Sequence, residues 1–131
     1  MFVDASAIVA ILIEEEDATA LTRRLEQSAQ AFTSPVAIYE AVLGVARVRN
    51  VPIPAAVTIL DRFIEQAAVR VMSITPEIGR DAVLACERYG RGRHPAALNM
   101  GDCFAYACAR TLDLLLLYKG NDFPHTDLTL G

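Results

Sequence analysis

The feature that most constrains the fold is a repeated alternation of short apolar runs with longer helical patterns. The apolar runs cover residues 1–3, 31–33, 69–72 and 114–118, and their lengths suit buried strands. Segments with helical spacing separate them, over 5–13, 18–27, 35–48, 54–67 and 76–89, and a further one carries residue 102. Such alternation predicts an α/β fold with a central, mainly parallel β-sheet flanked by α-helices. Residues 128–130 are a weaker candidate for another strand.

The chain has the size and apolar content of one domain spanning residues 1–131. It is 53% hydrophobic, with no internal repeat or linker, and 131 residues suffice to bury a core. Charged residues interrupt every apolar run well before the roughly 18 to 20 residues that a membrane helix needs. No basic stretch precedes the first apolar run, and Asp4 would interrupt a signal peptide. We therefore expect a cytoplasmic protein without a membrane segment.

Four acidic residues stand in apolar or small-residue surroundings where a charge is costly: Asp4, Glu40, Asp102 and Asp122. Asp4 follows the first apolar run and Asp122 follows the last. The carboxyl ends of parallel strands are where open α/β sheets bind ligands. Asp102 opens a helix of small and apolar residues, and Glu40 lies on an apolar helix face. We expect these acids to converge on one crevice.

Each acid taken alone has a structural alternative. Asp4 and Asp122 can serve as helix caps or turn residues, and Asp102 can exchange capping hydrogen bonds with Asn99, three residues earlier. Glu40 resists this interpretation, because an acid on an apolar helix face must be paired, protonated or bound to a cation. Considered together, the four acids indicate a shared cation.

The ligand types indicate which cation. Carboxylate oxygens without His or Cys select Mg²⁺ or Mn²⁺ over zinc or copper. The usual substrate of such a cluster is a phosphodiester, whose hydrolysis a metal assists by activating water and offsetting charge. The cysteines, Cys86, Cys103 and Cys108, have no CxxC spacing and lie in apolar helical stretches, where a thiol is expected to behave as a small hydrophobic group. Cys103 as a nucleophile is a minor alternative, since no motif brings a histidine to it.

Several motifs resemble the PIN-domain ribonucleases of the VapC toxin type. They are Asp-Ala-Ser-Ala at 4–7, the isolated Glu40, Asn-Met-Gly-Asp-Cys-Phe-Ala-Tyr-Ala at 99–107, and Leu-Leu-Tyr-Lys-Gly-Asn-Asp-Phe at 116–123. The resemblance covers nearly the whole chain. It implies a PIN-like fold and a Mg²⁺- or Mn²⁺-dependent endoribonuclease, the toxin of a type II toxin–antitoxin pair. By the same resemblance, the four acids form the catalytic and metal-binding quartet, Ser6 supports it, and Asn99 and Asn121 orient acids or water.

The sequence departs from that family at one position of the last motif. Many PIN domains carry Asp-x-Asp-Phe there, whereas Gly120 takes the first acidic place in this chain. Two alternatives stay open for the fourth ligand. Asp122 holds the metal directly or through water, or Asp127 contributes if the terminal turn folds back.

An RNA substrate requires local positive charge, since the chain has 12 basic and 16 acidic residues. The candidates for phosphate binding are Arg91 and Arg93, just before Asn99, and Lys119, the only lysine. The acidic run at 14–17 is expected to be a solvated helix end. Three aromatic residues have faces that can stack on bases, but core positions are the preferred interpretation: Tyr39, Tyr106 and Phe123.

The resemblance also implies partners. It predicts a small VapB-like antitoxin whose tail lies along a groove formed by the helices at 5–13 and 36–48, and a homodimer. Two other classes of function remain as alternatives. One is another metal-dependent phosphoesterase, such as a DNA or flap-type nuclease, and the other is a catalytically silent partner-binding module.

Overall fold

A parallel β-sheet forms the centre of the computed structural model, which describes residues 1–120 and 123–128. Its strands are β1 (Phe2–Val3), β2 (Ala31–Thr33), β3 (Val69–Val71) and β4 (Leu116–Leu117), in the order β3-β2-β1-β4. Every pairing is parallel, and Phe2 is in register with both Phe32 and Leu116. The predicted α/β class with a parallel sheet is confirmed.

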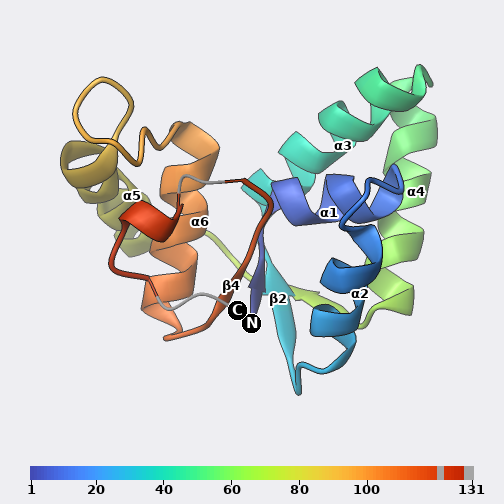
Figure 1. Ribbon diagram of the computed structural model, residues 1–131, viewed down its shortest axis with the longest axis horizontal. Coiled ribbons are helices and arrows are strands. Elements are labelled where there is room, and N and C mark those ends of the chain that lie inside the picture. Colours follow the sequence, from blue (N-terminus) through green and yellow to red (C-terminus); the bar gives the residue numbers. More distant parts are fainter. Residues whose placement is uncertain (121–122, 129–131) are drawn as a thin grey trace.

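Helices cover both faces of the sheet (Figure 1). They are α1 (Ala5–Leu12), α2 (Ala18–Glu26), α3 (Pro35–Arg49), α4 (Ile53–Gln66), α5 (Pro76–Tyr89) and α6 (Met100–Thr111), and a short 3₁₀ helix spans Phe123–His125. Figure 1 shows α1 to α4 on one side of the strands and α5 and α6 on the other. None of the described helices has both the length and the apolar character needed to cross a membrane.

Local sequence signals set where α3 and α5 begin. The Ser34 hydroxyl accepts a hydrogen bond from the Ala37 N–H at 3.1 Å, and Thr75 caps α5 in the same way through the Ile78 N–H at 3.2 Å. A proline follows each cap at the first helical position, where its missing N–H and fixed φ cost nothing. These signals explain why both helix starts agree with the sequence prediction.

The run at 114–118 is only partly a buried strand. Leu116 and Leu117 are fully buried, but Leu115 is 42% exposed. The N–H of Leu114 donates to the Ala109 carbonyl at 2.8 Å, so this residue still closes α6. The expected strand is therefore shorter than its apolar pattern. Leu128 belongs to no strand, and residues 129–131 lie outside the described residues.

The carboxyl ends of three strands are joined by hydrogen bonds beside Asp4. The buried Thr33 hydroxyl, at the end of β2, donates to the Val3 carbonyl at 2.9 Å. The Asp4 N–H donates to the Leu117 carbonyl, also at 2.9 Å. These bonds fix the point at which the chain leaves β1, and so they fix the backbone that carries Asp4.

Candidate active site

Asp4 lies where β1 ends and α1 begins, and it is 4% exposed. Its Oδ2 accepts hydrogen bonds from the backbone N–H of Ser6 at 3.1 Å and from the Ser6 hydroxyl at 2.5 Å. The first bond makes Asp4 the N-cap of α1, as its structural alternative predicted. The hydroxyl adds a second bond that capping does not require, and it orients the carboxylate.

Asp102 occupies the first turn of α6 and completes a capping box with Asn99. The Asp102 N–H donates to Asn99 Oδ1 at 2.9 Å, and the Asn99 N–H donates to Asp102 Oδ2 at 3.0 Å. The exchange predicted from their spacing is confirmed. It satisfies two backbone donors and holds the carboxylate at a helix N-terminus, where the helix dipole favours negative charge.

Glu40 reaches from α3 to the start of α6. Its carboxylate lies so close to Gly101 that a Cβ atom at residue 101 would overlap both carboxylate oxygens. Burial, and then the negative charges of Asp4 and Asp102, raise the pKa of Glu40 to about 7. The structure therefore brings three of the four predicted acids into one electrostatic neighbourhood, from three separate elements.

This neighbourhood suits a divalent cation in chemistry and charge. Carboxylates are hard oxygen ligands, and a bound cation relieves the repulsion that raises the pKa of Glu40. In residues 1–120 and 123–128, no group of three or more Asp, Glu, His or Cys side chains has an arrangement that could hold a metal ion. The remaining predicted acid, Asp122, and its neighbour Asn121 lie outside the described residues.

The departure at Gly120 coincides with an unusual backbone conformation. Its φ is +122°, in the region that L side chains rarely adopt. An aspartate at this position, as in the Asp-x-Asp-Phe pattern, would be strained. The glycine therefore suits the turn that follows β4 in this chain.

Asp127 contacts a tyrosine and two arginines, and none of these contacts is with the clustered acids. The Tyr106 hydroxyl donates to its Oδ1 at 2.5 Å, and Arg110 donates to its Oδ2 at 3.3 Å. Arg88 lies 3.9 Å from the same Oδ2. The Tyr106 hydrogen bond, aided by both arginines, lowers the pKa of Asp127 despite the opposing effect of burial. The alternative that made Asp127 a metal ligand is not supported.

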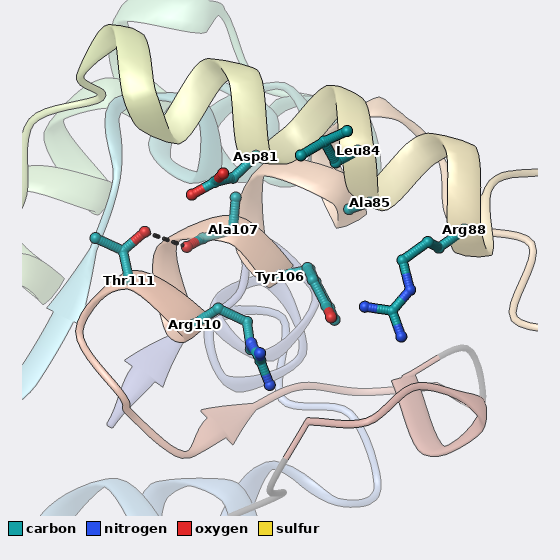
Figure 2. A pocket seen from close by; sticks show the side chains of 8 residues that line it. All are labelled: Asp81, Leu84, Ala85, Arg88, Tyr106, Ala107, Arg110 and Thr111. Carbon is teal, nitrogen blue, oxygen red and sulfur yellow. Dashed lines mark hydrogen bonds between the residues drawn. The ribbon is translucent and has the colours of Figure 1, made fainter.

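A cavity of about 350 Å³ lies between α5 and α6, and the three partners of Asp127, Arg88, Tyr106 and Arg110, are among the residues that line it. Figure 2 shows Arg88 and Tyr106 toward one end of the cavity, and Asp81 and Thr111 toward the other. The Thr111 hydroxyl donates to the Ala107 carbonyl at 2.8 Å, so its proton is already used in a hydrogen bond within α6. Asp4, Glu40 and Asp102 do not line this cavity, which is therefore distinct from the candidate active site.

Arg91 and Arg93 are both exposed, and each lines a cavity that includes Val83 and Cys86 of α5. Arg91 lines a cavity of about 390 Å³ with Asn99 and Met100, at the start of α6. Arg93 lines another cavity with Glu87, on α5. None of Asp4, Glu40 and Asp102 lines either cavity, but the cavity of Arg91 reaches Asn99, the capping partner of Asp102, whereas the cavity of Arg93 does not.

Lys119 is paired with the acidic run that was expected to be solvated. Its Nζ contacts the Glu15 carboxylate and lies 3.5 Å from Asp17 Oδ1. Glu14 and Glu16 are exposed, as predicted, but that prediction is wrong for the two paired acids. The sequence carried one signal of this contact, since Lys119 is the only lysine, but local pattern cannot show which distant acids it meets.

Cys103 and the aromatic candidates have mainly structural positions. Burial, with smaller effects of Cys86 and Asp102, raises the pKa of Cys103 to about 11, so its thiol stays protonated near neutral pH. Tyr106 and Phe123 are buried, as preferred, but Tyr39 is 64% exposed. The core interpretation is therefore wrong for Tyr39, which neighbours Glu40 on α3.

Comparisons with known proteins show which family the chain belongs to. Residues 1–128 match the PIN domain family. A VapC ribonuclease of Rhizobium meliloti (strain 1021) is 42% identical, with 97% of this chain and 98% of the relative covered. Ribonuclease VapC30 of Mycobacterium tuberculosis (strain H37Rv) is 35% identical, with 98% and 95% covered.

A solved structure supports the fold independently. The crystal structure of Mycobacterium tuberculosis VapC20, described as a sarcin-ricin loop cleaving toxin, superposes with a TM-score of 0.76 at 17% identity. The match covers 98% of this chain and 95% of that one. The chain belongs to the PIN-domain family and, within it, to the VapC ribonucleases, the endoribonuclease toxins of toxin–antitoxin systems.

Proposed function

We propose that Asp4, Glu40 and Asp102, together with Asp122, hold a Mg²⁺ or Mn²⁺ ion on which RNA cleavage by this protein depends. The observation that carries the proposal is that carboxylates from β1–α1, α3 and α6 share one electrostatic neighbourhood, in which burial and then the charges of Asp4 and Asp102 raise the pKa of Glu40. Evenly solvated acids would have no reason to gather in this way, because like charges repel.

The neighbouring polar groups assign roles within this site. Ser6 holds Asp4 by two hydrogen bonds, and Asn99 holds Asp102 through the capping box. Glu40 has no comparable anchor among the described hydrogen bonds, so its carboxylate is the one that adjusts to an ion or positions water. Asp122 is proposed as the fourth acid, acting directly or through water, and Asn121 as the residue that orients it.

A bound Mg²⁺ or Mn²⁺ ion supplies positive charge that favours ionisation of water and offsets charge on the phosphoryl group. The chain itself supplies the contacts that place the RNA. Arg91 lines a cavity with Asn99 and Met100 at the start of α6 and is proposed to bind a phosphate, with Arg93 as a weaker candidate. The exposed ring of Tyr39, one residue before Glu40 in α3, offers a surface on which an unpaired base can stack.

Membership of a toxin–antitoxin family implies an antitoxin, and we propose a VapB-like partner and a homodimer for this chain. Exposed apolar side chains support a protein partner. They lie on α3 (Tyr39, Leu43 and Val48), on α4 (Ile53 and Val57) and on α5 (Val83 and Leu84). Light scattering of the toxin alone and with its co-expressed antitoxin tests both assemblies. A monomer at micromolar concentration would contradict the homodimer.

Calorimetric titration of Mn²⁺ into the purified, chelator-treated protein tests the ion site without relying on activity. The wild type is expected to bind Mn²⁺, and Asp4→Asn to lose at least tenfold in affinity because a ligand charge is removed. Asp61→Asn, an exposed acid on α4, is the matched control and should bind as the wild type does. Equal affinity in Asp4→Asn and the control would overturn the assignment.

A further inference from the structure

The side chain of Lys119 is held by two acids from the turn between α1 and α2. Its Nζ contacts Glu15 Oε2 and lies 3.5 Å from Asp17 Oδ1. Both of these oxygens are closed off from solvent, and within the described part of the chain neither takes part in a hydrogen bond. Lys119 is the cation that faces them. An RNA phosphate would have to compete with two carboxylates for this lysine.

The backbone of the same residue is connected to the proposed ion site. The Lys119 N–H donates to the Ser6 hydroxyl at 2.9 Å, and that hydroxyl donates to Asp4 Oδ2 at 2.5 Å. A serine hydroxyl has one proton to give. Since its oxygen accepts from Lys119, this proton is directed to Asp4. A continuous chain of contacts therefore runs from Glu15 and Asp17, through Lys119 and Ser6, to Asp4.

Lys119 lies at the start of the turn that follows β4, where an ion pair can fix the position of the backbone. The residue lies two positions after the end of β4 and precedes Gly120, whose φ of +122° marks a sharp change in backbone direction. The Asp4 N–H binds the Leu117 carbonyl, so the backbone is fixed on one side of Tyr118. On the other side, the ion pair of Lys119 fixes the turn at its start.

From these contacts we infer that Lys119 is a positioning residue, not a phosphate-binding lysine: its ion pair with Glu15 and Asp17 holds the backbone N–H that orients Ser6 and thereby Asp4. This role rests on the proposed function, in which Asp4 holds the ion. Partners that orient metal ligands typically change metal affinity or activity by about 10- to 100-fold when they are removed. Lys119 acts through two further hydrogen bonds, so we expect the lower end of that range.

The two roles for Lys119 predict opposite effects when its acidic partners are neutralised. In the positioning role, Lys119→Met and the double variant Glu15→Gln/Asp17→Asn both weaken Mn²⁺ binding and lower kcat about tenfold, with KM for an RNA oligonucleotide unchanged. In a phosphate-binding role, Lys119→Met raises KM and leaves Mn²⁺ affinity intact. The double variant then lowers KM, because it frees the lysine for phosphate.

Matched variants separate positioning from general damage. Lys119→Arg keeps a cation in place and is expected to restore Mn²⁺ affinity to within about threefold of the wild type, since a guanidinium pairs with carboxylates at least as well as an ammonium does. Arg91→Met is the control for phosphate binding and should raise KM alone. Unchanged Mn²⁺ affinity in both Lys119→Met and the double variant would overturn the inference.

Amide hydrogen exchange of the metal-free protein tests the backbone link without any ion. In the double variant, exchange of the Lys119 amide should accelerate at least several-fold, whereas the Met72 amide, bonded to the Thr33 carbonyl on the far side of the sheet, should not change. Equal acceleration at both amides, or at neither, would contradict the inference. Absence of Mn²⁺ binding by the wild type would instead refute the proposed ion site, while the exchange result would still decide whether the ion pair holds this backbone.

Discussion

The carboxylate of Glu40 occupies the space that a side chain at residue 101 would fill. This contact between α3 and α6 depends on a missing atom, because glycine alone lacks the Cβ that would collide with both carboxylate oxygens. It places the acid of one helix against the first turn of another, next to Asp102. The glycine of the 99–102 motif therefore belongs to the site, although it has no reactive group.

Gly101→Ala should damage the site while sparing the fold. The group displaced is the far end of a flexible side chain, and alanine favours a helix by up to about 1 kcal/mol over glycine. We expect unfolding free energy within about 1 kcal/mol of the wild type, and Mn²⁺ affinity and RNA cleavage reduced about 10- to 100-fold. Urea denaturation and calorimetry measure the two effects.

Gly79→Ala is the matched control, since a Cβ at this α5 position meets no atom within 4 Å. It should leave activity unchanged. Full activity in Gly101→Ala would show that the position of the Glu40 carboxylate does not matter.

Asn99→Ala removes one half of the capping box around Asp102. Loss of an N-cap side chain costs about 1 kcal/mol of stability, and the freed Asp102 should bind Mn²⁺ less tightly. Thr75→Ala removes a cap of the same kind from α5 and should cost a similar amount of stability without changing Mn²⁺ affinity. If the two variants affect Mn²⁺ binding equally, Asn99 is a helix cap and nothing more.

The pKa of Asp127 should depend on Tyr106. The Tyr106 hydroxyl is the largest cause lowering it below the ordinary 3.8. Because the folded value is depressed, the stabilisation is complete above the unfolded pKa and is lost as pH falls through the folded pKa. Tyr106→Phe should raise the Asp127 pKa in an NMR titration, and should cost about 0.5 to 1 kcal/mol at pH 7, a low value since the Asp127 side chain is 38% exposed and solvent screens its charge.

An Asp127 pKa that is identical in the two proteins would show that the Tyr106 hydrogen bond is not formed in solution. Arg110→Met provides a second comparison, because this arginine is a weaker cause of the same shift. Its effect on the Asp127 pKa should have the same direction and be smaller than that of Tyr106→Phe.

Cys103→Ala should retain RNA cleavage, because a thiol with a pKa of about 11 supplies almost no nucleophilic thiolate near neutral pH. The side chain is 3% exposed, so some loss of stability from the cavity is expected. Cleavage is compared at equal concentrations of folded protein. Loss of activity beyond the loss of folded protein would implicate the thiol.

Local signals explain why much of the fold can be predicted from the sequence. Ser34 and Thr75 mark helix starts through hydrogen bonds that involve only their own first turns. The apolar runs mark the strands, since β1 and β4 are fully buried. Where a run serves two elements the prediction fails, as at Leu114, which closes α6 before β4 begins.

In the candidate site, too, some features could be predicted from the sequence and others could not. Isolated acids on apolar surfaces are visible in a sequence because burial of a lone charge is costly, and this identified Asp4, Glu40 and Asp102. The pairing of Lys119 with Glu15 and the fit of Glu40 against Gly101 join residues distant in the chain. Such contacts depend on how helices pack, which no local pattern specifies.

The most direct test of the central claim is cleavage of single-stranded and structured RNA by the antitoxin-free protein with Mn²⁺, with Mg²⁺ or with EDTA. Asp4→Asn and Asp102→Asn are assayed beside the wild type, with Asp61→Asn as a control and the matching DNA strand as a second substrate. The account predicts internal RNA cleavage that needs a divalent ion and falls at least 100-fold in both site variants but not in the control. Cleavage at the wild-type rate in EDTA, or by either site variant, would contradict it.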